Sequence, residues 1–407
     1  MVLLSCAEIK EAPATDRSMG GEPLINLQHF NHLYKEISIA GDTMAIMHIY
    51  SEYPDYDYAI EPSEGFTCVD DVARAVVFLS EYYKTGKAPE GTLHQIAMLV
   101  KFVLHLQHKN GYFNNFIWHD LSVNTEYKTS VATLNWWSLR AFWALETAFP
   151  LLQNDTHLSA RISLAIEKLM ANIKRDLTPL PMVQDTVNTL PTPTWLPSQS
   201  AADQAAVLVL ALLPYYQRTG DPTAQNLVDV MAKGIMQMQK GGEGQYPYGA
   251  FLSWGNLWHA WGNSQAYALL KAGQVFNNET YIKSALLEVD HFYPYLLENG
   301  LAEAFWVEQE AAHLTEVKRN AFPQIAYGIR PMVWAATEAY QVTKQEKYLA
   351  LADTLTSWFL GNNVARRVMY DAATGRAYDG IISENNINQN SGAESTIECL
   401  LTLLKIH

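Results

Sequence analysis

Cysteine is scarce in this chain, with three residues in 407, at positions 6, 68 and 399. Three thiols are too few for the disulfide framework that stabilises many small secreted domains, and the chain is long enough to build a large apolar core instead. Long apolar runs are also missing, since none approaches the roughly 18 residues of a membrane-spanning helix. Strand-like alternation of apolar and polar residues is rare, which favours a helical fold.

Clusters of positive charge are absent as well. The formal net charge is −14, and the 28 Lys and Arg residues are spread along the chain. Because a nucleic-acid surface needs a basic patch, no nucleic-acid partner is predicted. Metalloprotease, phosphate-loop and dinucleotide fingerprints are missing, so the sequence predicts no metal and no cofactor. Aromatic residues, in contrast, reach 12% and crowd stretches that read as loops.

A recurring pair of helical patterns organises the chain. The first members begin near Cys68, Lys128, Gln199, His259, Gln324 and Asn390, which by subtraction are 60–71 residues apart. A unit that recurs at this spacing indicates a repeat architecture. First members such as "SAADQAAVLVLALL" are apolar on most faces and should be buried, whereas second members carry more charge. The pairs are expected at 68–84 with 90–107, 128–148 with 156–174, 199–217 with 222–240, 259–275 with 278–297 and 324–343 with 345–360, followed by 390–406.

These patterns predict an all-α fold, an (α/α)6 toroid over residues 22–407 with an inner and an outer ring of helices. A further helix at 27–40 is expected to pack on the last inner helix and close the ring. An open right-handed solenoid is the alternative, and it would not need that contact. The connections from outer to inner helices are long and aromatic, so function is expected on one face, over the N-termini of the inner helices.

Residues 1–21 are expected to be a leader and tether. Leu3-Leu4-Ser5-Cys6 resembles a bacterial lipobox, and a polar stretch follows it. A lipid on Cys6 would place the protein in the bacterial periplasm or on the outer-membrane surface. The basic and apolar regions of a signal peptide are mostly missing from this sequence, so an accidental match in a cytoplasmic protein is the alternative.

Two adjacent acids begin the first inner helix, in "EGFTCVDDVARAVVFLSEYY". Thr67 and Asp70 have the spacing of a capping box, and Arg74 can pair with either Asp70 or Asp71. These structural roles account for one acid. Adjacent helical side chains point about 100° apart, so one of the two should face the ring centre. We expect Asp71 to be a catalytic base, with Asp70 as its partner.

A third acid, Glu394, begins the last inner helix in "NINQNSGAEST". Ser391 and Glu394 again have capping-box spacing, which is the structural alternative to a catalytic role. Polar side chains are dense here, and sugars need many neutral donors and acceptors. We therefore predict substrate contacts from Tyr378, Asp379, Asn388 and Asn390.

The chain resembles the six-hairpin glycosidase group in its helical organisation and in two motifs. The first motif is Cys68-Val69-Asp70-Asp71 with Arg74, and the second is the stretch of residues 386–396. In the inverting cellulase-like enzymes of that fold an early pair of Asp residues holds and deprotonates a water, and a late Glu is the acid. The resemblance implies these roles for Asp70, Asp71 and Glu394.

Other expected sugar contacts lie at the starts of other inner helices. Trp258, His259, Trp261 and Asn263 read as a stacking platform with hydrogen-bonding ends, against the alternative of tryptophans in a core. Arg330 faces either the cavity or a loop carboxylate, and a buried Asp203 requires a partner. The remaining expected contacts are Trp118, Glu126, Gln324 and Tyr327.

Three functions remain open at this point. The first is an inverting glycoside hydrolase acting on an oligosaccharide or polysaccharide, with Asp as general base and Glu394 as general acid. The second is a polysaccharide lyase or sugar epimerase of the same fold, in which His259, Tyr327 and His119 would abstract a carbon-bound proton. The third is a non-catalytic glycan-binding lipoprotein.

Overall fold

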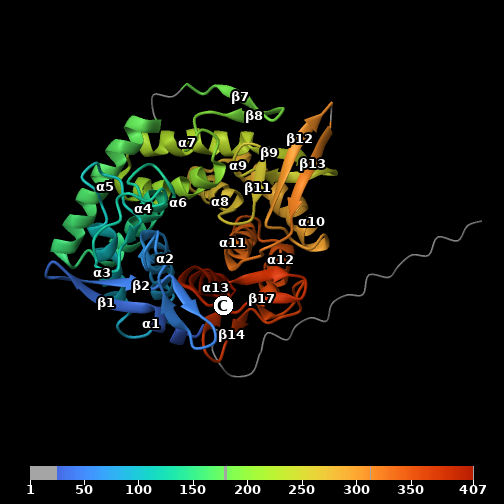
Figure 1. Ribbon diagram of the computed structural model, residues 1–407. Coiled ribbons are helices and arrows are strands. Elements are labelled where there is room, and N and C mark those ends of the chain that lie inside the picture. The colour runs from blue at the N-terminus through green and yellow to red at the C-terminus, as the bar shows by residue number, and fades with distance from the viewer. Residues whose placement is uncertain (1–24, 178–180, 312, 407) are drawn as a thin grey trace, which may run out of the picture.

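The computed structural model describes residues 25–177, 181–311 and 313–406, and six helices form its centre. Each of these helices packs against the next, and the last packs against the first, so that they form a closed circuit (Figure 1). In order they are α2 (Val69–Lys84), α4 (Trp136–Ala148), α6 (Ala202–Thr219), α8 (Gln265–Phe276), α11 (Ala326–Thr343) and α13 (Ala393–Lys405).

A second set of helices covers this circuit from outside, and each packs on the inner helix that precedes it in the chain. They are α3 (Thr92–His105), α5 (Thr156–Leu177), α7 (Pro222–Gln237), α9 (Glu279–Leu287) and α12 (Lys347–Thr356). The outer helix predicted at 278–297 is interrupted, because a π-helical turn at Glu288–Phe292 separates α9 from α10 (Tyr293–Glu298).

The inner helices are buried on nearly every face, as their apolar sequences predict. In α6 every residue from Ala202 to Leu213 is buried, whereas α5 buries one side only. At about 25 cal/mol per Å² of apolar surface, this burial is the dominant stabilising contribution to the fold. Polar side chains within this core therefore need partners, and their partners define the site described below.

The N-terminal helix is shorter than predicted. The pattern at 27–40 suggested one helix, but α1 covers only Gln28–Leu33 and the chain continues as a strand from Tyr34. Residues 34–39 pair with residues 42–47 in an antiparallel hairpin. α1 nevertheless packs against α13, which is the contact expected of a closed ring and not of an open solenoid.

The fold is mostly helical, but the prediction of a strictly all-α chain was wrong. Short antiparallel strands fill the connections, and they escaped the sequence reading because two to eight residues are too few to show a clear alternation. They are β1 (Tyr34–Ile39), β2 (Asp42–Met47), β3 (Tyr50–Glu52), β4 (Asp57–Ala59), β5 (Thr67–Cys68), β6 (Phe116–Ile117), β7 (Gln184–Val187), β8 (Leu190–Pro193), β9 (Gln239–Gly242), β10 (Gln245–Phe251), β11 (Leu257–His259), β12 (Ala304–Glu310), β13 (His313–Asn320), β14 (Tyr370–Asp371), β15 (Arg376–Ala377), β16 (Gly380–Ser383) and β17 (Asn386–Asn388).

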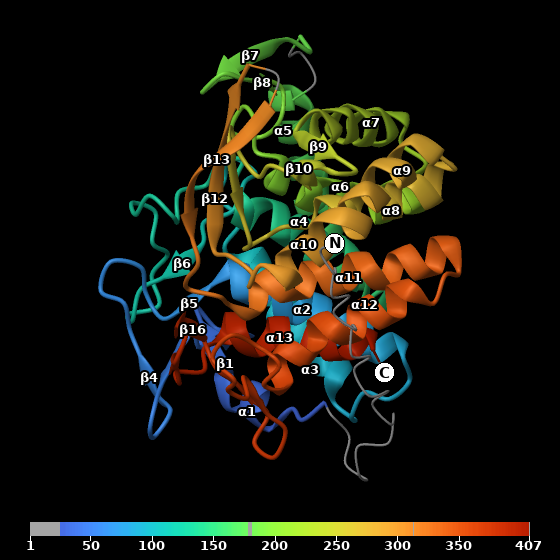
Figure 2. The ribbon, with the colours of Figure 1, turned by 90° about the vertical axis from the view of Figure 1, so that its right-hand side faces the viewer.

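Several of these strands lead directly into inner helices and so fix where those helices begin. β5 pairs with β6 and runs into α2, β11 pairs with β12 ahead of α8, and β16 pairs with β17 ahead of α13. Seen from the side, these strand pairs gather at one end of the helical circuit (Figure 2). The N-termini of the inner helices and the strand pairs thus form one mouth of the molecule.

The predicted leader and tether, with Cys6, lies outside the described residues. Within the part of the chain that the structure covers, no helix combines the length and hydropathy that crossing a membrane requires.

Candidate active site

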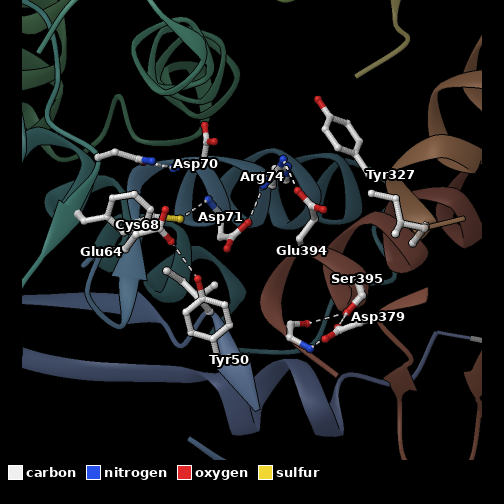
Figure 3. Close-up of a pocket in the computed structure, with 16 residues that line it drawn as sticks. Tyr50, Glu64, Cys68, Asp70, Asp71, Arg74, Tyr327, Asp379, Glu394 and Ser395 are labelled. Carbon is white, nitrogen blue, oxygen red and sulfur yellow. Dashed lines mark hydrogen bonds and ion pairs between the residues drawn. The ribbon is translucent and has the colours of Figure 1, made fainter. Parts of the chain in front are cut away.

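A cavity of about 290 Å³ opens at the mouth, between the N-terminal ends of α2, α11 and α13. It brings together Asp70, Asp71 and Glu394, which are far apart in the sequence (Figure 3). The side chains and backbone that line it belong to Ile49, Tyr50, Glu64, Cys68, Asp70, Asp71, Arg74, Asn115, Phe116, Ile325, Ala326, Tyr327, Asp379, Gly392, Glu394 and Ser395.

Neither aspartate caps helix α2. The Sγ atom of Cys68 accepts the hydrogen bond from the Asp71 backbone N–H at 3.4 Å, and the Thr67 hydroxyl is buried without a hydrogen-bond partner in the described structure. The predicted capping box of Thr67 and Asp70 is therefore wrong. Because the cap is supplied by Cys68, both carboxylates remain free to point away from the backbone.

The two carboxylates leave α2 in different directions (Figure 3), and each is held by a different arginine. Asp71 accepts a hydrogen bond from Arg74 Nη1 at 2.5 Å, and Asp70 pairs with Arg140 Nη1 of α4 at 2.6 Å. Arg140 also donates to the Tyr327 hydroxyl at 2.5 Å, which links Asp70 to α11. Asp70 thus connects three inner helices, while Asp71 faces the cavity beside Arg74.

Glu394 meets the same arginine from the opposite side of the circuit. Its Oε2 accepts from Arg74 Nη2 at 2.7 Å, so one guanidinium lies between the carboxylates of Asp71 and Glu394 (Figure 3). The predicted capping box of Ser391 and Glu394 is wrong, because the Ser391 hydroxyl donates to the Ala377 carbonyl instead. The Glu394 side chain is 41% exposed, towards the cavity.

Desolvation changes the protonation of these acids. Although the Glu394 side chain is exposed to the cavity, the surrounding protein displaces much of its water, which raises its pKa from 4.5 to about 7. The charge of Arg74 opposes this shift, and repulsion from Asp71 and Glu398 adds to it. Burial also raises the pKa of Asp71, with Arg74 opposing the shift and Asp70 adding to it. Two neighbouring acids in distinct surroundings, one of them partly protonated near pH 7, are an arrangement suited to general acid–base chemistry.

A buried ion network supports the cavity from below. Glu398 of α13 is fully buried, 3.1 Å from Arg74 Nε and 2.6 Å from Arg330 Nε. The Arg74 guanidinium also lies over the Tyr327 ring, with 4.7 Å to the ring centroid. Arg74 is therefore held on several sides, and through it the positions of Asp71 and Glu394 are fixed.

Asp379 also lines the cavity, as predicted for a substrate contact, but its hydrogen bonds are internal. Its Oδ1 accepts from the Gly392 backbone N–H at 2.9 Å and from the Ser395 hydroxyl at 2.7 Å. Burial raises the pKa of Asp379, and these two hydrogen bonds oppose the shift. Asp379 caps the start of α13 and orients the turn that carries Glu394.

Comparison with known proteins identifies solved structures that have a similar architecture. No family model and no curated protein matches the chain. Among solved structures, it is similar to a sugar epimerase from a ruminal bacterium (12% identity, 88% of this chain and 91% of that one, TM-score 0.59). A family 76 glycoside hydrolase from a bovine Bacteroides thetaiotaomicron strain (10% identity, 89% and 73%, TM-score 0.58) and a cellulase of C. cellulolyticum (13% identity, 91% and 89%, TM-score 0.52) are also similar. The chain has the six-hairpin glycosidase-like (α/α)6 fold. At these identities the likeness concerns the fold alone.

Some residues that were predicted to contact a sugar lie in the core of this six-hairpin fold and not at its cavity. Trp258 is 1% exposed and stacks on Phe305 at 5.0 Å between ring centroids, so the prediction that it stacks on a sugar was wrong. His259 is buried beside Asp203, with 2.9 Å between Nε2 and Oδ2, which supplies the partner that Asp203 was expected to need. Trp261 is partly buried and stacks on His259 at 4.0 Å.

Three further residues that were predicted to contact the substrate are buried polar side chains of the core. Arg330 pairs with Glu398, a carboxylate of an inner helix and not of a loop. The Gln324 amide donates to the Gly300 carbonyl at 2.9 Å and holds that loop. Asn263 is buried at the start of α8 and lines no part of the cavity.

The remaining predicted contacts lie in the connections of the six-hairpin fold, outside the cavity. Asn388 and Asn390 use their side-chain oxygens to accept backbone N–H groups, of Asn390 and Tyr53 respectively. Trp118 and Tyr378 are partly buried and Glu126 is exposed, and none of these five residues lines the cavity. Their contacts with a sugar stay predictions, and any such contact would lie outside the acid cavity.

Sequence reasoning missed several residues of the site. Tyr50 donates to Glu64 at 2.9 Å across the cavity wall, and Asn115 accepts from the Asp70 backbone N–H at 3.1 Å. Arg140 was missed although an arginine amid the apolar residues of "NWWSLRAFWAL" requires a buried partner, a signal that was available. In the described residues no group of three or more metal-ligating side chains has the arrangement of a metal site.

Proposed function

We propose that this protein is a glycoside hydrolase that acts on an oligosaccharide or polysaccharide with inversion at the anomeric carbon. The observation that carries the proposal is the pair Asp71 and Glu394, which share one cavity and one arginine. The similarity to a glycoside hydrolase and a cellulase of this fold supports a carbohydrate substrate.

In the proposed reaction Glu394 is the general acid and Asp71 the general base. Glu394 donates its proton to the glycosidic oxygen, and the bond from that oxygen to the anomeric carbon breaks. A water attacks the anomeric carbon from the opposite face and transfers a proton to Asp71. Inverting enzymes need about 6.5–9.5 Å between the two carboxyl groups to admit the water. In this site each of the two acids contacts a different terminal nitrogen of the Arg74 guanidinium.

The cavity walls suit a sugar ring. Tyr50, Phe116 and Tyr327 provide aromatic surface for its apolar faces, while Asn115 and Ser395 provide neutral polar groups. The volume of about 290 Å³ is at the lower end of the roughly 300–1,000 Å³ typical of ligand pockets. This size fits the reacting end of a glycan.

The stereochemical outcome tests the proposal. We expect incubation with a panel of neutral oligosaccharides to release a reducing sugar from at least one member, and the first product seen by proton NMR to have the inverted anomeric configuration. Release of the retained anomer would overturn the inverting mechanism, and release of no sugar from any member would overturn the hydrolase.

The pH dependence of hydrolysis is expected to report the protonation of Glu394. A general acid must carry its proton, and because the pKa of Glu394 is raised to about 7, its protonated fraction falls as the pH rises through 7. We expect kcat/KM to fall by about tenfold per pH unit above that value. Measuring kcat/KM from pH 5 to 9 checks this, and a flat profile up to pH 9 would contradict it.

Tyr327 supports a second candidate, a lyase or epimerase. Tyr327 lines the cavity, its hydroxyl accepts a hydrogen bond from Arg140, and the Arg74 guanidinium lies over its ring. A tyrosine held at this place is suited to taking a proton from a carbon atom of a sugar. The sugar epimerase among the similar folds is in line with this alternative. His259 and His119 fit it less well, since one is buried against Asp203 and the other is exposed and outside the cavity. Absorbance of an unsaturated uronic acid, without release of a reducing sugar by water, would favour the lyase.

A further inference from the structure

Among the residues that the structure describes, Trp254 is the one tryptophan that counts as an exposed side chain. It is 54% exposed, in contrast to the buried Trp258 four residues later. It lies in the turn between β10 and β11, and the preceding residue, Ser253, accepts a hydrogen bond at 2.9 Å from the backbone N–H of Ala202, the first residue of α6. Trp254 is thus anchored at the N-terminal end of an inner helix, which is the end where the acid cavity opens.

The Trp254 indole is held in one orientation. Its Nε1–H donates to the Ser198 carbonyl at 3.1 Å, and the next residue, Gly255, donates its backbone N–H to the Ser200 hydroxyl at 3.0 Å. Large exposed apolar side chains are ordinarily free to move, so two hydrogen bonds that fix this turn indicate that the position of the ring matters. A fixed aromatic ring loses less conformational entropy when a ligand stacks on it.

Neutral hydrogen-bonding side chains lie on the segments that contact the turn of Trp254. Asn188 is exposed and donates to Asn256, two residues after Trp254, at 3.1 Å. Thr189 is exposed and accepts from the Gln309 backbone N–H at 2.9 Å. Ser198 and Gln199 are exposed on the loop that holds the indole. A flat aromatic face bordered by uncharged amides and hydroxyls matches a neutral sugar ring, which has apolar C–H faces and hydroxyls around its edge.

The position of Trp254 relative to the acids defines its role. In the circuit of inner helices α6 and α8, which flank Trp254, stand opposite α13 and α2, which carry Glu394, Asp70 and Asp71. We infer that Trp254, with Asn188, Thr189, Ser198 and Gln199, forms a distal subsite for a neutral sugar unit of a glycan whose reacting end occupies the acid cavity. This inference rests on the proposed function, and it assigns the substrate as a chain of several sugar units.

Binding measurements on a turnover-deficient protein test the subsite. The probes are neutral gluco- and manno-oligosaccharides of two to six units, added to the Glu394→Gln variant and followed by calorimetry and by tryptophan fluorescence. We expect the longest members to bind at least about tenfold more tightly than the dimers, because only they reach Trp254. The further substitution Trp254→Ala should remove this dependence on length, and Trp254→Phe, which keeps a ring, should restore part of it.

Tyr83→Ala is the matched control, since Tyr83 is 41% exposed at the C-terminal end of α2, on the other end of the circuit. It should leave the length dependence intact. The subsite would be overturned if dimers and hexamers bound with equal affinity, or if none of the probes bound. It would also be overturned if Trp254→Ala kept both the wild-type melting temperature and the wild-type dependence of affinity on length. A failure of the proposed hydrolase activity can be told apart from a failure of the subsite, because binding is measured without turnover.

Discussion

Replacing Glu394 with Gln is expected to reduce hydrolysis of an oligosaccharide by about 10²–10⁴-fold, the range contributed by a positioned general acid. The amide keeps the shape of the side chain and removes the proton that the leaving oxygen needs. A glycoside with a phenolate leaving group of low basicity needs no such proton, so its hydrolysis should be reduced much less. The measurement is kcat/KM for both substrates in wild type and variant.

The Asp71→Asn variant distinguishes the role of the general base from that of the general acid. Without a base to accept the proton from water, both substrates should lose activity by about 10²–10⁴-fold, whatever the leaving group. Asp353→Asn, on the exposed side of α12, is the matched control and should retain wild-type rates. If Glu394→Gln slowed both substrates equally, or neither variant lost activity, the assigned roles would be wrong.

Replacing Arg74 with Ala is expected to destabilise the fold by about 3–5 kcal/mol, the cost of breaking a buried ion network by removing one partner. The variant leaves Asp71 and one side of the Glu398 carboxylate buried without their cation. Urea unfolding at pH 7 measures the difference in the free energy of unfolding. Arg161→Ala is the control, because its ion pair with Asp42 is exposed and should contribute about 1 kcal/mol or less.

The pH dependence of the Arg74→Ala variant shows whether charge is the cause. Without the guanidinium, the pKa of the buried Asp71 rises further, so the folded variant binds a proton that the unfolded chain releases above its ordinary pKa. Its stability should therefore improve relative to wild type as the pH falls from 8 to 5. Neutralising both partners in the double variant Arg74→Met, Asp71→Asn, which keeps Glu398 as the partner of Arg330, should recover much of the loss. A loss below about 1 kcal/mol at pH 7, or one that does not change with pH, would show that the network is not held by charge.

The sequence predicted the large-scale organisation well because helices follow local rules. Apolar periodicity and the spacing of the repeats located each of the six inner helices, although α4 and α8 begin several residues later than the pattern suggested. Short hairpins and the strand after α1 were missed, since a strand is defined by its partner and not by its own few residues. The acids at the starts of α2 and α13 were recognised because polar residues at the entrance of an apolar helix are conspicuous.

The site was only partly predictable, because its contacts join distant segments. The hydrogen bond from Arg74 to Glu394 spans 320 residues of sequence, and the pair Arg140–Asp70 joins α4 to α2. Spacing alone left open which aspartate Arg74 would bind, and it suggested capping boxes that the backbone does not form. The two tryptophans of "WGNLW" also look equivalent in sequence, yet β11 turns Trp258 into the core and the preceding turn leaves Trp254 exposed.

By itself, the sequence determined a mostly helical repeat protein with acids at the entrances of its first and last inner helices, since periodicity and helix-start composition are properties of neighbouring residues. Only the tertiary structure decided that α13 packs beside α2, so that Asp71 and Glu394 meet on one arginine, and that Glu398 and Arg330 support it from below. The physical reason is that burial and the pairing of charges depend on which surfaces exclude water together, and those surfaces come from both ends of the chain.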